Sequence, residues 1–288
     1  EITNTSNHPQ QHSRHSMSFS FDSEFEALVG VLNYEGYVHN LLAWAMIVTG
    51  GFAALALIAG ITAPYGRFGS QSHARFFGFM VPGRLAWFLQ ESPALFVPLV
   101  HLLYFYPVLS TPGRILFVLF LAHYTNRALI YPLRLRTPSP TPVAVMLMAL
   151  FYCLWNGYLQ ARSLSIFQAH SEDWLLDPRF WIGIALFLIG MRINLQSDEI
   201  LRNLRKPGET GYKVPRGGIF RWVSAGNYFG ESIEWLGFAV ACWSLPALAF
   251  FLFTLSNLLP RARQIHKDYL RKMDDYPKDR TAFIPFLL

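Results

Sequence analysis

One stretch of 23 residues, from Leu41 to Ala63, contains no ionisable side chain. About 20 predominantly apolar residues are enough for a helix to cross the hydrocarbon core of a bilayer. The stretch is too long, and begins too far into the chain, to be the apolar region of a signal peptide. It therefore predicts a membrane-spanning chain. The composition agrees, because only 15% of the residues are charged, against about 25% in soluble domains.

Six further apolar stretches follow, at residues 85–107, 115–133, 143–161, 178–196, 229–244 and 246–260. The last two are separated only by Trp243-Ser244-Leu245-Pro246, where a proline fits a tight helical hairpin. We therefore expect an all-α integral membrane protein, built as a bundle of seven transmembrane helices. Residues 1–35 are expected to form a polar N-terminal extension that is partly disordered. Residues 36–288 are expected to form a single seven-helix membrane domain with cytosolic loops.

Lysine and arginine concentrate in the cytoplasmic connections of membrane proteins and so indicate orientation. The segment before the first span is acidic, and basic connections then alternate with connections poor in basic residues. Seven basic residues lie between Gly190 and Phe229, and seven more follow Pro260. This pattern places the N-terminus outside and the C-terminus in the cytosol, at either a bacterial inner membrane or the endoplasmic reticulum membrane. The net charge of +6 follows this topology, so we expect no nucleic-acid partner.

An ionisable side chain inside a span costs about 2.5–3.5 kcal/mol on insertion scales, so each one calls for an explanation. Glu91 lies a few residues into the second span, one turn after Trp87 and on the same helix face. Two interpretations stay open. Glu91 is either a carboxylate near the interface that pairs with a cation such as Arg84, or a neutral carboxyl group that lines an internal pocket and donates a hydrogen bond.

The third span carries a polar stripe. Tyr124, Arg127 and Tyr131 stand at positions i, i+3 and i+7, and therefore on one helix face. Such a stripe is explained either by hydrogen bonds that hold helices together or by a binding site. A phenol is neutral at pH 7 and is suited to donating a hydrogen bond to a carbonyl group.

The densest polar set begins where the fifth span ends. Asn194 and Asp198 stand four residues apart, and Asn227, Glu231 and Glu234 share one face of the sixth span. Cations from several segments accompany them: Arg202, Arg205, Lys206, Lys213, Arg216, Arg261, Arg263 and Arg280. Basic residues at a helix end could simply reflect the helix dipole and the topology. Cations from separate segments, together with carboxylates inside an apolar helix, predict more, namely a site for a polyanionic ligand with a hydrogen-bonding head.

The sequence lacks the motifs of several common kinds of binding and catalytic site. The chain has no Gly-x-Gly-x-x-Gly after a strand and no Gly-Lys-Ser/Thr loop, so neither standard phosphate cradle is present. The nine histidines form no clustered metal-binding pairs, and Cys153 and Cys242 both lie in apolar stretches. We therefore expect no metal and no disulfide framework. Nothing matches the turn that carries a nucleophilic serine.

Four runs stand out in the last third of the chain. They are Gly-Met-Arg-Ile-Asn from residue 190, Val-Pro-Arg-Gly-Gly from residue 214, Val-Ser-Ala-Gly-Asn-Tyr-Phe-Gly-Glu from residue 223, and Asp-Tyr-Pro-Lys from residue 275. Together they closely resemble the C-terminal half of steroid 5α-reductases, nearly without interruption over residues 190–288. Two shorter runs, at residues 87–91 and 123–127, resemble the same family.

The resemblance implies a seven-helix membrane enzyme that uses NADPH to reduce the Δ4 double bond of a 3-oxo steroid, with hydride transfer to C5. It implies that Glu91 and Tyr124 are catalytic and hydrogen-bond the 3-carbonyl group. Substrate-binding residues would be Trp87, Gln90, Glu91, Tyr124 and Arg127. Residues implied to bind NADPH, from cytosolic loops and helix ends, are Asn194, Asp198, Arg205, Tyr212, Lys213, Asn227, Glu231, Arg261, Tyr269 and Arg280.

The two ligands would come from different phases, because the steroid is soluble in membrane lipid and the dinucleotide is a polyanion in the cytosol. No obligate protein partner is inferred.

The sequence departs from the family at two places. Lys213 stands where members often carry Arg, which replaces a bidentate phosphate contact by a single ammonium contact. Residues 264–266 read Gln-Ile-His where mammalian relatives have a run of His.

Three other functions stay open. A trans-2-enoyl-CoA reductase of fatty-acid elongation would share the segment around Asn227 and Glu231, although Gln90-Glu91 and His123-Tyr124 favour a steroid. A membrane methyltransferase would bind S-adenosylmethionine, but the Arg-His-Pro segment expected for it is missing. A non-enzymatic sterol-binding membrane protein would need the helical bundle but not the cytosolic cations.

Overall fold

The computed structural model describes residues 18–61, 74–136, 138–204, 209 and 213–288. The chain divides into two compact units, residues 1–41 and 42–288. Residues 1–17 of the expected polar extension lie outside the described residues, and the chain is helical from Ser18 onward in α1 (Ser18–Ile58).

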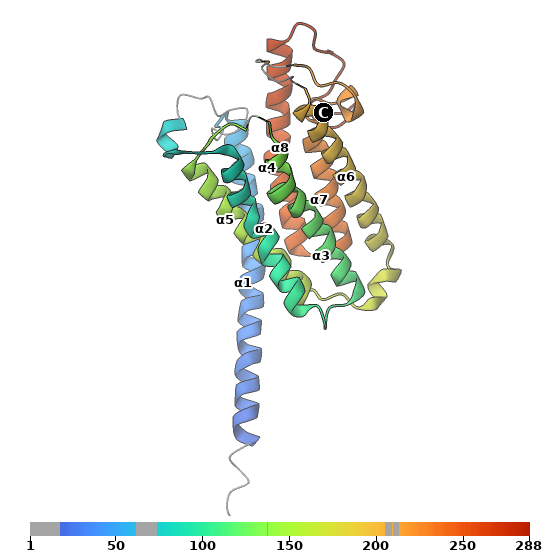
Figure 1. Cartoon of the computed structure of the whole chain (residues 1–288). Helices are drawn as coiled ribbons and strands as arrows, with labels where there is room; N and C mark the ends of the chain where they lie inside the picture. The colour runs from blue at the N-terminus through green and yellow to red at the C-terminus, as the bar shows by residue number, and fades with distance from the viewer. Residues whose placement is uncertain (1–17, 62–73, 137, 205–208, 210–212) are drawn as a thin grey trace, which may run out of the picture. The chain divides into compact units, whose positions relative to one another are not determined.

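The described residues fold into helices joined by short connections (Figure 1). Within the described part of the chain, five helices are long and apolar enough to cross a membrane: Phe25–Ile58, Gly83–Phe105, Val143–Phe167, Pro178–Arg202 and Leu245–Lys272. Large apolar side chains such as Phe96, Leu103 and Phe151 are exposed on their outer faces. Exposed apolar surface of this kind is rare on soluble monomers and suits contact with lipid. The chain is therefore an all-α protein of the membrane type.

The helix α2 (Gly83–Phe105) packs along α5 (Val143–Arg162), which continues as a π-helical segment, η4 (Ser163–Phe167). A short ladder between β1 (Met80–Val81) and β2 (Thr141–Pro142) joins the starts of these two helices, next to η2 (Ala74–Phe77). Gly157 lets them approach closely, because a Cβ atom there would lie 3.0 Å from the Pro93 carbonyl oxygen. This close approach places the polar residues of α2 against α5.

A single helical run from residue 111 to residue 134 corresponds to the expected third span. It consists of α3 (Thr111–Tyr124), a π-helical segment η3 (Thr125–Ile130) and α4 (Tyr131–Arg134). Ser110 caps its start by accepting a hydrogen bond from the Gly113 N–H. π-helical segments occur frequently at functional sites, and η3 carries Arg127.

The helices α6 (Pro178–Arg202) and α7 (Gly226–Cys242) run side by side (Figure 1). Their backbones nearly touch, because a Cβ atom at Gly190 would lie 2.2 Å from the Glu234 nitrogen, and one at Gly230 would lie 2.5 Å from the Asn194 nitrogen. Small residues at helix contacts are typical of membrane bundles. Short 3-10 helices, η5 (Glu172–Leu176) and η6 (Gly218–Arg221), precede α6 and α7.

The last helix, α8 (Leu245–Lys272), follows α7 after the short turn at Trp243 and Ser244. It extends 12 residues beyond Pro260, where the sequence predicted that the seventh span ends and a tail begins. Pro260 lies inside the helix, because its missing N–H removes only one backbone hydrogen bond. Arg261 and Tyr269 are buried on this extension, which gives its polar sequence a packed face.

Candidate active site

The Glu91 carboxyl group on α2 and the Tyr124 phenol on α3 meet the same face of α5. Glu91 Oε2 accepts a hydrogen bond from the Cys153 Sγ at 3.6 Å, and the Tyr124 hydroxyl oxygen accepts one from Asn156 Nδ2 at 3.3 Å. Cys153 and Asn156 stand three residues apart, which places them on one helix face. The structure therefore brings the two predicted catalytic side chains to neighbouring positions.

The first interpretation of Glu91, a pairing with Arg84, does not hold. The Arg84 guanidinium donates instead to the Leu135 carbonyl oxygen at 2.7 Å, on the exposed end of α2. Glu91 is half-buried, and its Oε1 accepts a hydrogen bond from its neighbour Gln90 at 3.3 Å. The carboxyl group is thus held inside the bundle, and its role as a hydrogen-bond donor stays a prediction.

Two buried amides behind Tyr124 extend this arrangement, and the sequence reasoning missed both. Gln160 Nε2 donates to Asn156 Oδ1 at 3.1 Å and to the Pro246 carbonyl oxygen at 2.9 Å. Asn156 and Gln160 are 0% and 1% exposed. They stand at i and i+4 inside the apolar span 143–161, so the argument that singled out Glu91, a polar residue inside a span, could have found them as well.

The guanidinium group of Arg127 lies at the centre of a second polar cluster. Its Nη1 is 3.5 Å from Asp198 Oδ2, and its Nη2 is 3.7 Å from Glu231 Oε2. Asn227 Nδ2 donates to Asp198 Oδ1 at 3.2 Å, and Asn194 Nδ2 donates to the Asn227 carbonyl oxygen at 3.0 Å. Arg127, which was predicted to bind the substrate, is therefore surrounded by four residues that were predicted to bind the cofactor: Asn194, Asp198, Asn227 and Glu231.

Aromatic rings fix the position of Arg127. Its guanidinium carbon lies 5.2 Å from the centre of the Trp87 ring and 5.1 Å from that of Tyr131. The Trp87 indole N–H donates to the Arg127 carbonyl oxygen at 3.0 Å, which joins α2 to η3. A cation held over aromatic faces in this way is stabilised by about 0.5–2 kcal/mol. Two members of the predicted polar stripe, Arg127 and Tyr131, are therefore packed together with Trp87.

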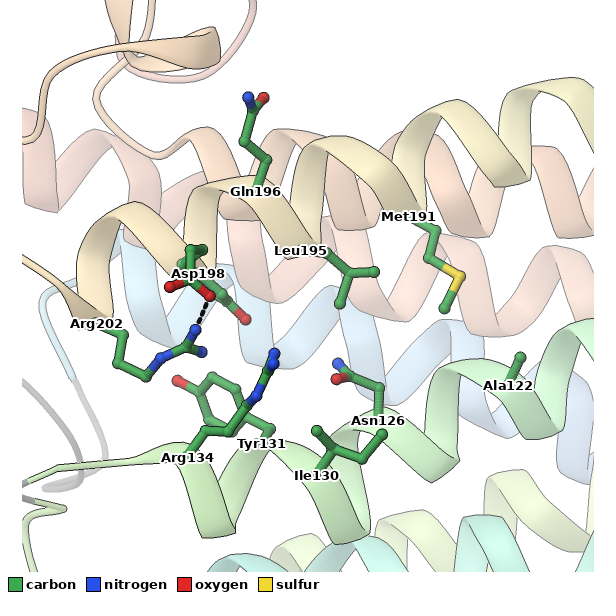
Figure 2. Close-up of a pocket in the computed structure, with 11 residues that line it drawn as sticks. Ala122, Asn126, Ile130, Tyr131, Arg134, Met191, Leu195, Gln196, Asp198 and Arg202 are labelled. Atoms are coloured by element: carbon green, nitrogen blue, oxygen red, sulfur yellow. Dashed lines mark ion pairs between the residues drawn. The ribbon is translucent and has the colours of Figure 1, made fainter.

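A pocket of about 490 Å³ opens between α6 and the run α3–η3–α4, next to the Arg127 cluster (Figure 2). Asp198 and Tyr131 belong both to this pocket and to the surroundings of Arg127. Figure 2 shows polar side chains at one end of the pocket and apolar ones, such as Leu195 and Met191, towards the other. The remaining lining residues are Ala122, Asn126, Ile130, Arg134, Gln196, Glu199 and Arg202.

Two further residues that were predicted to bind the cofactor, Tyr269 and Arg280, are buried near the C-terminus. Arg280 donates from Nη1 to the Pro215 carbonyl oxygen at 2.9 Å and lies 5.2 Å from the centre of the Tyr276 ring. Tyr276 stacks in turn on Tyr269 at 5.1 Å. His266 belongs to the Gln-Ile-His run that differs from mammalian relatives. Its Nδ1 atom is hydrogen-bonded to the Ser224 hydroxyl group at 2.6 Å. A parallel bridge between Val223 and Thr281 anchors the C-terminal segment.

The donor set of this region fits a polyanionic cofactor. Arg261 and Arg280 are 7% and 6% exposed, and the buried Nε atom of Arg280 has no hydrogen-bond partner among the described residues. A buried guanidinium is costly unless an anion accompanies it, so a phosphate-bearing ligand would complete the site. Lys213 is exposed and forms an ion pair with Glu209. Arg205 and Tyr212 lie outside the described residues.

These features define a helical, membrane-type protein with an internal polar site formed between α2, α3, α5, α6 and α7. A family model described as 3-oxo-5-alpha-steroid 4-dehydrogenase matches residues 139–288. The chain belongs to this family, the steroid 5α-reductases, as the sequence resemblance predicted.

Curated relatives agree over most of the chain. Rat 3-oxo-5-alpha-steroid 4-dehydrogenase 1 is 49% identical over 245 residues, which is 83% of this chain and 92% of the rat protein. The human protein of the same name is 49% identical over 77% of this chain and 85% of its own length. Rat 3-oxo-5-alpha-steroid 4-dehydrogenase 2 is 48% identical over 72% of this chain and 82% of its own length.

Proposed function

We propose that this chain is a steroid 5α-reductase that reduces the Δ4 double bond of 3-oxo-Δ4 steroids to 3-oxo-5α-steroids, with NADPH as the donor. The observation that carries the proposal is the 49% identity, over 92% of its length, to a rat protein named for this steroid chemistry. The contacts of Glu91 and Tyr124 with neighbouring positions of α5 support it, because they gather two hydrogen-bonding groups inside the bundle.

The chemistry requires stabilisation of negative charge. When hydride adds to C5 of the enone, charge develops on the 3-carbonyl oxygen, and donors already in place at that oxygen lower the barrier. Removing one such donor typically costs about 10²–10³-fold in rate. The Tyr124 phenol and a protonated Glu91 carboxyl group would supply the two donors. The Gln90 amide, which donates to Glu91, would hold that carboxyl group in place.

Trp87 and Arg127 would form the boundary between the substrate and the cofactor. Trp87 is tied to the Arg127 backbone by a hydrogen bond, and the Arg127 guanidinium faces the carboxylates of Asp198 and Glu231. A shift of Arg127 would therefore be transmitted both to the α2 side, where Glu91 lies, and to the α6–α7 side.

NADPH, when bound, supplies the hydride. The residues that would hold it are Asn194, Asp198, Arg205, Tyr212, Lys213, Asn227, Glu231, Arg261, Tyr269 and Arg280. The amides and carboxylates of α6 and α7 would hydrogen-bond its polar groups, and the guanidinium groups near the C-terminus would neutralise its phosphates. The buried Nε atom of Arg280, which has no hydrogen-bond partner among the described residues, supports a phosphate-binding role for the C-terminal guanidinium groups.

We infer seven spans with the N-terminus outside. Beyond the five long helices, the run from residue 111 to residue 134 and α7 would supply the other two. In this topology the cofactor residues at the ends of α6 and α8 face the cytosol, and the steroid enters from the lipid of a bacterial inner membrane or the endoplasmic reticulum membrane.

The decisive experiment incubates the purified chain with NADPH and either testosterone or a trans-2-enoyl-CoA. We expect the steroid to be converted to its 5α-dihydro product, identified by its stereochemistry, while the thioester is left unreduced. Reduction of the thioester alone would overturn the proposal in favour of an enoyl reductase. If neither compound were reduced and NADPH gave no thermal stabilisation, the result would favour a sterol-binding protein.

A further inference from the structure

The hydrogen bonds behind Tyr124 run in one fixed direction. They begin at the Pro246 carbonyl oxygen, which can only accept, so Gln160 must turn its NH₂ group towards it, at 2.9 Å. In the opposite rotamer the Gln160 oxygen would face that carbonyl oxygen at the same short distance, which is repulsive. The backbone of α8 therefore fixes the orientation of the Gln160 amide.

The same NH₂ group fixes the next amide. Gln160 Nε2 also donates to Asn156 Oδ1 at 3.1 Å. An amide presents its oxygen on one side and its NH₂ group on the other, so Asn156 must present Nδ2 to the Tyr124 hydroxyl group, 3.3 Å away. The three side chains are 1%, 0% and 4% exposed, so bulk water does not compete for these bonds.

The consequence concerns the single hydrogen of the phenol. Because Asn156 donates to the Tyr124 oxygen, the O–H of Tyr124 is not used in that bond. Among the described residues, this O–H donates no hydrogen bond, since the bond from Asn156 is the one that the hydroxyl group makes. A hydroxyl group that already accepts a hydrogen bond is also polarised towards donating one. The phenol is thus ready to donate to an incoming carbonyl group.

We propose that Asn156 and Gln160 are positioning residues, which set the direction in which Tyr124 donates its hydrogen bond to the substrate carbonyl. The inference rests on the proposed function, in which Tyr124 is that donor. Neither amide touches the substrate in this scheme. Their role is to hold the phenol as an acceptor on its α5 side and a donor on its free side.

The test compares substitutions at residue 156 that differ in polarity. In Asn156→Asp a carboxylate would accept the Tyr124 O–H and turn it away from the substrate, so kcat should fall about 10²–10³-fold, as in Tyr124→Phe. In Asn156→Leu the phenol loses its orienting partner but is free to donate, so the fall should be about tenfold or less. In both variants the KM for NADPH should stay unchanged.

A matched control is available on α8. The Asn257 amide donates to the Phe253 carbonyl oxygen and has no contact with Tyr124, so Asn257→Asp should leave kcat unchanged. Turnover of testosterone gives kcat, and thermal stabilisation by NADP⁺ shows that each variant is folded. If Asn156→Asp kept the wild-type kcat, or if Asn156→Leu fell as far as Asn156→Asp while still stabilised by NADP⁺, the proposal would be overturned.

A second substitution avoids a buried charge, in case Asn156→Asp does not fold. Gln160→Met removes the anchor of the amide pair, so that Asn156 can turn either side to the phenol. We expect kcat to fall about threefold to tenfold with no change in the KM for NADPH. An unchanged kcat would refute the positioning role. A Tyr124→Phe variant that kept full turnover would refute the role of Tyr124 as the donor, and the positioning role with it, whereas a wild-type chain that did not reduce testosterone would refute the proposed function itself.

Discussion

The His123 Nδ1 atom lies 2.8 Å from Glu234 Oε1, and this contact joins α3 to α7 in the centre of the bundle. Glu234 is 0% exposed, and its second oxygen has no hydrogen-bond partner among the described residues. The His123 ring packs against Trp235 at 4.5 Å and against its neighbour Tyr124 at 5.1 Å. The pair thus holds the helix end that carries Tyr124.

Substitution of Glu234 should test this tie. Glu234→Ala leaves the His123 Nδ1 atom buried without its hydrogen-bond partner, which costs about 1–3 kcal/mol. Glu234→Gln keeps an oxygen in place and should cost much less. Thermal unfolding in detergent would measure both losses. An equal loss of stability for the two variants would mean that side-chain volume, rather than the hydrogen bond to His123, is what matters at this position.

The Glu91 carboxyl group should be required for turnover but not for cofactor binding. Glu91→Gln replaces the carboxyl group with a weaker donor at the carbonyl, so kcat should fall about 10²-fold. Stabilisation of the variant by NADP⁺ should match that of the wild type. Glu172→Gln provides the control, because Glu172 lies on η5 and accepts from the Thr111 N–H, away from the site. A Glu91→Gln variant with normal kcat would exclude this group from catalysis.

Arg127 should be needed for its shape as well as its charge. It reaches Asp198 with one nitrogen and Glu231 with another, a geometry that a lysine ammonium cannot reproduce. We expect Arg127→Lys to raise the KM for NADPH about tenfold, the equivalent of one charged hydrogen bond. Arg127→Ala, which leaves two carboxylates without their cation, should also lower the unfolding temperature. Steady-state kinetics at varied NADPH would detect the first effect, and wild-type KM in Arg127→Lys would show that charge alone suffices.

Much of the helical architecture followed from hydropathy, because an apolar run such as residues 178–196, which α6 contains, has few alternatives to a membrane helix. The identity of the polar site residues followed from the cost of placing Glu91 and Arg127 inside such helices. Their partners did not follow. The contact between Tyr124 and Asn156 depends on the rotation and depth of α3 relative to α5, which no periodicity within one helix specifies.

Two features could not be derived from one segment of the sequence. The pattern of the third span does not reveal that the charge of Arg127 is matched by Asp198 and Glu231 from α6 and α7, and its role toward the substrate stays a prediction. The apolar stretch 246–260 ends at Pro260, but hydropathy alone does not specify where the helix ends. In the folded chain the burial of Arg261 and Tyr269 carries the helix on to Lys272. In both cases tertiary packing decides what the local pattern leaves open.

The contact between α6 and α7 should be intolerant of even one methyl group. A Cβ atom at Gly190 would lie 2.2 Å from the Glu234 nitrogen and 2.6 Å from its Cα, both backbone atoms that cannot rotate away. Gly190→Ala should therefore force the helices apart and cost about 1–3 kcal/mol or more. It should also weaken NADP⁺ binding, since Asn194 and Asp198 lie further along the same helix.

Gly51→Ala is the matched control for Gly190→Ala, because nothing lies within 4 Å of a Cβ atom there. Alanine is about 1 kcal/mol better than glycine inside a helix, so the control should be neutral or slightly stabilising. Thermal unfolding with and without NADP⁺ would compare the two, and equal stability of both variants would show that the bundle can relax around Gly190.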